Sequence, residues 1–123
     1  MTEADLLDSV LDLAQLLKWR RVHFRPAMVA KDGKLTYRTA VQGDGQGYPD
    51  LTMVHRKQKR LVYAECKSDK GRVSPEQKEW LDDLDSTGKA EVYLWRPKHW
   101  HSGEIERILK SHVFEGEVES EWR

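Results

Sequence analysis

Hydrophobic residues recur at helical spacing at the start of the chain. Over residues 2–19 they fall on one face of a helix, at Leu6, Val10, Leu13 and Leu17. Thr2 and Asp5 precede them in positions that cap a helix N-terminus. The pattern therefore predicts an amphipathic helix that packs on a core through its leucine and valine side chains.

Two further helices are expected. Residues 74–88 carry helix start and stop signals, because Ser74 suits the N-cap, Pro75 the first turn and Gly88 the position beyond the end. A short helix over residues 102–114 would pack through three apolar side chains, Ile105, Ile108 and Leu109.

Segments rich in β-branched and aromatic residues predict the strands. These segments are residues 20–29, 35–41, 50–55, 60–67 and 90–97. The turn KDGK separates the first two, the glycine-rich loop GDGQGYP follows them, and RKQK connects the next two. Together with the helices, this order predicts an α/β fold with a mixed sheet of four or five strands flanked by helices.

Length and composition predict one globular domain. A chain of 123 residues, 38% hydrophobic and 34% charged, can bury one core, and no apolar run approaches the length of a membrane span. We expect residues 1–114 to form the domain, residues 115–123 an acidic frayed tail, and KHWH at 98–101 a surface loop. The one cysteine, Cys66, permits no internal disulfide, which favours the reducing cytoplasm. A nucleoid-associated location is the alternative expectation.

The charges balance overall but are segregated along the chain. Lys and Arg total 21, as do Asp and Glu. Acidic residues gather in the first helix, in EWLDDLD and in the tail, whereas residues 16–40 and 55–78 are rich in Lys and Arg. A neutral protein of this kind can present a basic face to phosphates, although the same residues also suit an ordinary solvated surface.

The fourth predicted strand carries charged residues on one face. Glu65 and Lys67 alternate with the small apolar residues Ala64 and Cys66, so Cys66 is expected to be a buried hydrophobic residue. A hairpin turning between Lys57 and Gln58 places Asp50 opposite Glu65. Two unit charges about 5 Å apart repel by about 3 kcal/mol at an effective dielectric of about 20, which Mg²⁺ or Mn²⁺ would offset. A surface ion pair between Glu65 and Lys67 is the alternative.

These residues carry a resemblance to a nuclease family. Pro49-Asp50 followed by Glu65-Cys66-Lys67 resembles the PD-(D/E)XK signature. The longer sequence, with GYPDL, ECKSDKGRVSPEQKEWL and TGKAEVYLWRP in that order, resembles the VRR-NUC branch in its stand-alone form. The resemblance implies a restriction-endonuclease-like core with the element order αβββαβ.

The resemblance also implies roles for the charged residues. Asp50 and Glu65 would bind the metal ion, the backbone carbonyl of Cys66 would add a ligand, and Lys67 would orient or activate water. Glu3 in the first helix would complete the metal site, although it also suits a favourable first-turn charge.

The same resemblance gives Gln77 a catalytic role beside Lys67 or a phosphate. The alternative is a capping box with Ser74, and we expect the side chain to serve only one of the two roles.

The leading hypothesis is a Mg²⁺-dependent endodeoxyribonuclease that acts as a homodimer on branched DNA such as Holliday junctions, in a bacterial or phage-infected cell. Flanking phosphates would be held by basic residues, namely Arg20, Arg21, Arg56, Lys57, Arg60, Lys70 and Arg72. The alternatives are a non-catalytic nucleic-acid-binding module, a flap or nick repair nuclease, and a partner-binding subunit that uses its tryptophans and acidic tail.

Overall fold

The computed structural model of the protein describes residues 1–24, 27–31, 33–38, 42–111 and 122. Its elements are, in chain order, α1 (Glu3–Leu16), β1 (Arg20–Val22), β2 (Ala27–Lys31), β3 (Lys34–Arg38), β4 (Leu51–His55), β5 (Arg60–Cys66), α2 (Pro75–Ser86), β6 (Glu91–Trp95), α3 (Pro97–His101) and α4 (Glu104–Lys110). Within the described ranges, no helix combines the length and the apolar character that a membrane crossing requires.

Four strands form the main sheet, in the order β1, β4, β5, β6. The first three are antiparallel neighbours, whereas β6 runs parallel to β5. A parallel neighbour needs a crossover connection, and α2 supplies it. This mixed sheet flanked by helices confirms the predicted α/β fold, and α1, β1, β4, β5, α2 and β6 follow the predicted order αβββαβ.

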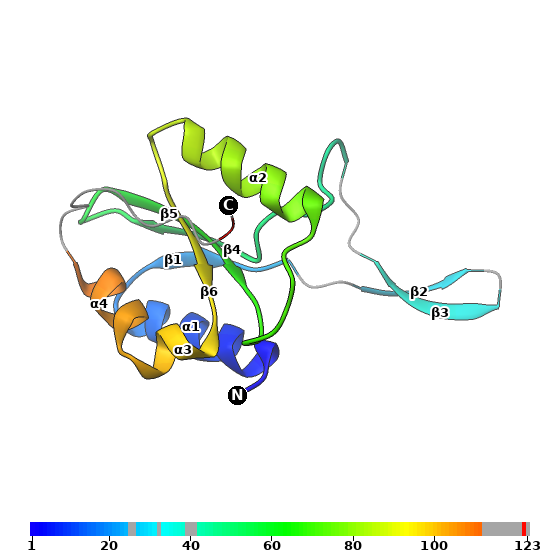
Figure 1. The fold of residues 1–123 in the computed structure, drawn as a ribbon, viewed down its shortest axis with the longest axis horizontal. Helices are drawn as coiled ribbons and strands as arrows, with labels where there is room; N and C mark the ends of the chain where they lie inside the picture. Colours follow the sequence, from blue (N-terminus) through cyan, green and yellow to red (C-terminus); the bar gives the residue numbers. More distant parts are fainter. Residues whose placement is uncertain (25–26, 32, 39–41, 112–121, 123) are drawn as a thin grey trace.

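The strands β2 and β3 form a separate antiparallel hairpin, which extends away from the main sheet in Figure 1. One prediction is therefore wrong: residues 20–29 are not a single strand, because β1 ends at Val22 and β2 begins at Ala27. The two strands pair with different partners, β4 and β3, so the chain leaves the main sheet between them.

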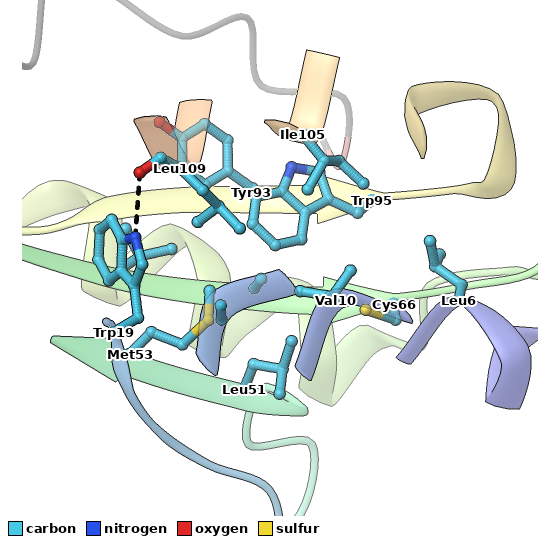
Figure 2. Close-up of a cluster of buried hydrophobic side chains, with 13 residues drawn as sticks. Leu6, Val10, Trp19, Leu51, Met53, Cys66, Tyr93, Trp95, Ile105 and Leu109 are labelled. Carbon is cyan, nitrogen blue, oxygen red and sulfur yellow. Dashed lines mark hydrogen bonds between the residues drawn. The ribbon is translucent and has the colours of Figure 1, made fainter. Parts of the chain in front are cut away.

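Helices cover both faces of the main sheet, with α1, α3 and α4 on one side and α2 on the other (Figure 1). The larger core lies on the first side, where Val62, Ala64 and Cys66 of β5 pack with α1. Figure 2 shows this core together with Trp19, whose Nε1–H donates to the Leu109 carbonyl oxygen at 3.0 Å. A smaller core beneath α2 is formed by Leu81, Val92, Leu94 and Trp122.

The two long helices begin where their capping residues predict. At α1, the Thr2 N–H donates to Asp5 at 2.8 Å and the Asp5 N–H donates to the Thr2 hydroxyl at 3.1 Å. At α2, Ser74 and Gln77 form the same reciprocal pair, with Pro75 at the first helical position. Each box satisfies backbone N–H groups that a helix N-terminus otherwise leaves without partners.

The segment expected to be a surface loop is the short helix α3, so that prediction is wrong. Its residue His99 is 8% exposed, and the ring Nδ1 accepts the Arg96 N–H at 2.8 Å. The helix expected over residues 102–114 begins at Glu104 and ends at Lys110, and residues 112–114 lie outside the described residues.

Trp122 falls in the segment expected to be a frayed tail. It is the residue of the segment 115–123 that the structure describes, and it is 5% exposed against the underside of α2. Its Nε1–H donates to Oδ1 of Asp82 at 2.6 Å. At this residue the tail prediction is wrong, because the indole completes the smaller core.

Candidate active site

The hairpin of β4 and β5 brings Asp50 and Glu65 together, as the sequence predicts. Leu51 pairs with Ala64, so the next position outward sets Asp50 opposite Glu65. Oδ2 of Asp50 accepts the backbone N–H of Cys66 at 2.8 Å. The Asp50 side chain is therefore anchored across the end of the hairpin, beside the strand that carries Glu65.

Glu65 is almost completely enclosed, at 1% exposure. Its Oε1 accepts the Gln77 Nε2–H at 3.0 Å and lies 3.8 Å from the Lys67 Nζ. Its Oε2 is buried and accepts no hydrogen bond from the described residues. Glu65 and Lys67 thus lie within ion-pair distance, as the alternative expected, but the pair is not on the surface, because the two side chains are only 2% and 13% exposed.

The surroundings of Glu65 favour its protonated form when no cation is bound. Burial is the main cause, the negative charge of Asp50 adds to it, and Lys67 offsets only part of the effect. Together they raise the pKa of the Glu65 carboxyl to about 9. The positive charge near Glu65 is therefore too small to keep its carboxyl ionised at neutral pH when no cation is bound.

Gln77 forms the capping box that the sequence presented as one alternative, and its side chain also contacts Glu65. Its Oε1 accepts the Ser74 N–H at 2.9 Å and completes the capping box of α2. Its Nε2 donates to Glu65. The two ends of the amide face different partners, so the capping box leaves Nε2 free for a contact in the site, and the catalytic role beside Lys67 or a phosphate stays a prediction.

Cys66 is fully buried, as predicted, and lies between the two charged residues of its strand. Burial and the nearby charges of Asp50, Glu65 and Glu3 raise the pKa of its thiol well above the usual range. Because the N–H and C=O of a strand residue point to the same side, the Cys66 carbonyl lies on the side of Asp50.

Glu3 is exposed in the first turn of α1. Across the described residues there is no group of three or more His, Cys, Asp or Glu side chains that could hold a metal ion. The structure therefore does not bring Glu3 into one cluster with Asp50 and Glu65, and its role as a metal ligand stays a prediction.

His23 is a site residue that the sequence did not reveal. Its Nδ1 lies 2.9 Å from the Asp50 carbonyl oxygen, which can only accept, so Nδ1 carries the proton. The bond joins the end of β1 to the residue before β4 and fixes the backbone from which the Asp50 side chain extends. No spacing or motif signals it, because the two residues are 27 positions apart.

The glycine-rich loop supports the site through Gly47 and Tyr48. A Cβ atom at Gly47 would lie 2.6 Å from the Glu76 carbonyl carbon, so only glycine allows the loop to approach the start of α2. The Tyr48 hydroxyl lies 2.9 Å from Thr52 Oγ1, and its ring makes edge contacts with Tyr63 and Trp80. The loop thereby connects the sheet to α2 directly before Asp50.

Two of the predicted phosphate-binding residues lie close to the site. Lys70 and Arg72 are exposed in the loop that joins Lys67 to α2. Arg96, which the sequence did not suggest, organises this loop by donating from Nη1 to the Ser68 carbonyl at 2.6 Å and the Gly71 carbonyl at 2.8 Å.

Other predicted phosphate-binding residues lie at the far end of the sheet. Arg56 and Lys57 are exposed at the turn between β4 and β5, just beyond His55, which lies about 17 Å from Asp50 at about 3.3 Å per strand residue. Arg20 is exposed on β1 and pairs with Val54, near the same end. Arg21 donates to Gln15 of α1 at 3.0 Å.

Arg60 does not belong to this group, and its prediction as a phosphate contact is wrong. It is 7% exposed and forms two hydrogen bonds with the Glu91 carboxylate, at 2.7 and 2.6 Å. It also donates to the carbonyls of Ile108 and Ser111, and its guanidinium lies over the Trp19 ring. Through these contacts Arg60 joins β5 to β6 and to the end of α4.

Comparison with protein families places this arrangement in a class of nuclease domains with the PD-(D/E)XK fold. The model of the VRR-NUC domain matches residues 13–95, and the chain belongs to this family. The match includes Asp50, Glu65, Lys67 and Gln77, whereas Glu3 precedes it. Neither the comparison with curated proteins nor the comparison with solved structures gave a match.

Proposed function

We propose that this VRR-NUC domain is a metal-dependent endodeoxyribonuclease. The observation that carries the proposal is the buried Oε2 of Glu65, which accepts no hydrogen bond from the described residues and belongs to a carboxyl beside Asp50. A buried acceptor without a partner is costly, and two adjacent carboxyls repel once both ionise. A bound divalent cation would remove both costs.

The donor set fits Mg²⁺ or Mn²⁺. The carboxylates of Asp50 and Glu65 and the carbonyl of Cys66 would hold the ion, since these hard cations prefer oxygen ligands and retain bound water. When bound, such an ion supplies positive charge that polarises a phosphoryl oxygen and lowers the pKa of water. Neither effect is available from the two carboxylates alone.

The remaining site residues position groups around this pair. Lys67, whose Nζ lies 3.8 Å from Glu65, would hold the scissile phosphate or the attacking water. Gln77 holds Oε1 of Glu65 in a fixed orientation and leaves Oε2 available. His23 and the Cys66 N–H restrain Asp50 from its backbone and its side chain.

Branched DNA is the proposed substrate class, with two copies of the chain acting together on a four-way junction. Basic residues at both ends of the sheet, such as Arg56 and Arg72, support contacts with phosphates on either side of the cut. A junction contains strands related by a two-fold axis, and two symmetric cuts require two sites related in the same way.

The test is cleavage of a four-way junction, a flap, a nicked duplex and a plain duplex, each in Mg²⁺ and in EDTA. We expect Mg²⁺-dependent cutting of the junction by the wild type and none by Lys67→Ala. Junction binding by the variant should persist, with the slope of log affinity against log salt changed by about one unit. If the wild type binds every DNA but cuts none, the domain is a binding module.

A further inference from the structure

Phe24 is an aromatic side chain exposed beside the candidate active site. It is 56% exposed, although burying such a ring is normally favourable. It directly follows His23, which is bonded to the Asp50 carbonyl. Phe24 is therefore one residue away from a contact with Asp50, its ring contacts Tyr48 two positions before Asp50, and the ring is accessible to a ligand.

Neighbouring aromatic side chains hold the Phe24 ring in place. Phe24 contacts Tyr48 edge to face, with ring centroids 6.3 Å apart at an interplanar angle of 68°. Tyr48 is itself restrained by its hydroxyl contact with Thr52 and by Trp80, whose ring centroid is 5.1 Å away. Phe24 is thus the exposed end of a chain of rings anchored in the sheet and in α2.

The charges around these rings indicate which end of the chain of rings, Phe24 or Trp80, a nucleic acid can reach. At the Trp80 end, a hollow of about 400 Å³ between the glycine-rich loop and α2 is lined by four acidic residues, Asp44, Glu76, Glu79 and Asp83. Such a surface repels phosphates. At the catalytic end lie the cationic side chains of Lys67, Lys70 and Arg72. Phe24 is therefore the accessible ring for a strand bound at the active site.

We propose that Phe24 stacks on the exposed face of a nucleobase at the branch point, where the stack of bases is interrupted, next to the scissile phosphate; this inference rests on the proposed nuclease function. Every base offers a flat π face to an aromatic ring, so the contact is independent of sequence. In an intact duplex both faces of a base are occupied by its neighbours in the stack. Phe24 is then a specificity-determining residue that favours branched DNA over a plain duplex.

The test measures binding in EDTA to two DNAs of the same sequence, one fully paired and one with an unpaired nucleotide at a three-way branch. Phe24→Ala should weaken binding to the branched DNA about tenfold, the order of effect that alanine replacement of a base-stacking aromatic produces. Binding to the paired duplex should not change. Phe24→Trp should retain the preference, and Val54→Ala, which alters another exposed hydrophobic residue, should behave as the wild type.

Equal losses on both DNAs, or no loss on either, would overturn the stacking role. A Phe24→Ala variant that changes its oligomeric state in sedimentation would overturn it as well, because the ring would then contact a second copy. Failure of the proposed nuclease function is a separate result. In that case the wild type would cut no DNA in Mg²⁺, while Phe24→Ala would still bind branched DNA more weakly in EDTA and bind the paired duplex as before. A wild type that binds no DNA would contradict both.

Discussion

Glu65 shows how one residue can be costly for folding and still be held firmly in place. The side chain is enclosed by β5 and α2, and one of its oxygens is bonded to Gln77 while the other accepts no hydrogen bond from the described part of the chain. Asp50 lies beside it and disfavours its ionisation. The fold thus accepts an unfavourable metal-free state at this position, as functional sites often do.

Replacing Glu65 should therefore change how stability depends on pH. In the unfolded chain its carboxyl titrates near 4.5, whereas in the fold its pKa is about 9. Between these two pH values the Glu65 carboxyl is protonated in the folded state and ionised in the unfolded state. Its contribution to the free energy of unfolding therefore falls as the pH rises, by at most about 1.4 kcal/mol per pH unit. Melting of Glu65→Gln in EDTA should show a gain over the wild type that grows from about pH 5 to pH 9.

Mg²⁺ provides the control for this prediction. A bound cation stabilises the ionised carboxyl, so added Mg²⁺ should raise the melting temperature of the wild type most at high pH. Glu65→Gln should respond much less. Identical pH profiles for the two proteins would mean that Glu65 ionises normally in the fold.

Gln77 allows the capping role and the site role to be separated. In Gln77→Glu the side chain still provides the oxygen that a capping box needs, but it loses the N–H that holds Glu65 and adds a third carboxyl group. We expect a large loss of cleavage with little change in helix stability. The measurements are single-turnover cleavage and urea denaturation.

Ser74→Ala is the matched control, because it removes the hydroxyl cap and leaves the Gln77 amide in place. It should lower the free energy of unfolding by about 1 kcal/mol and affect cleavage less than Gln77→Glu does. The reverse order of effects on cleavage would show that Gln77 acts only as a cap.

The sequence predicts the site where the interactions are local and fails where they are distant. Asp50 meets Glu65 through one hairpin, so counting residues from the turn was sufficient. His23 could not be predicted, because its bond to Asp50 depends on how β1 is placed against β4. Arg60 was misassigned because its partner, Glu91, lies on a strand that follows 31 residues later.

At the level of elements, the helices that carry their own start signals were predicted well. Both capping boxes involve residues three positions apart, so the sequence alone specifies them. The helix α3 was missed because it has five residues and its His99 is buried by the surrounding fold. The split between β1 and β2 was missed for a similar reason, since where each strand ends depends on its pairing partner and not on the β-propensity of its residues.

Gly47 tests how closely the glycine-rich loop must approach α2. Alanine there would adopt a positive φ of 83° and place its Cβ 2.7 Å from the Gln77 nitrogen. Gly43→Ala is a matched control, with a φ of 74° and no atom within 4 Å of the added Cβ. Both variants incur about 1–2 kcal/mol of backbone cost.

Only Gly47→Ala should also displace the start of α2 and with it Gln77. We expect it to be the less stable variant in urea denaturation and to lose cleavage, while Gly43→Ala keeps cleavage near the wild-type rate. Equal behaviour of the two variants would mean that the loop does not position the site.

At the scale of the whole molecule, Trp122 joins the end of the chain to the middle of the fold. The chain reaches α2 at this residue, which fills the space above Val92 and Leu94 of β6. The composition of residues 115–123 is acidic and predicted a solvated segment. Trp122 is buried despite the acidic composition of its segment, because it contacts the apolar surface between α2 and β6.

Trp122→Ala should accordingly destabilise the entire domain. Removing a buried tryptophan typically costs about 3–5 kcal/mol, which is a large share of the stability of a small domain. Trp122→Phe should cost less, since it keeps most of the apolar contact and loses the bond to Asp82. A denaturation midpoint of Trp122→Ala equal to that of the wild type would show that the indole is not part of the core.

The burial of Cys66 gives the unmodified protein a built-in reporter of opening. It is the one cysteine of the sequence, it is 0% exposed, and the thiolate that alkylating reagents require is suppressed by its surroundings. A maleimide can then label the chain only when β5 separates from α1. Because Cys66 adjoins Glu65, labelling should slow in Mg²⁺, so that mass spectrometry could follow cation binding without any substrate or introduced dye.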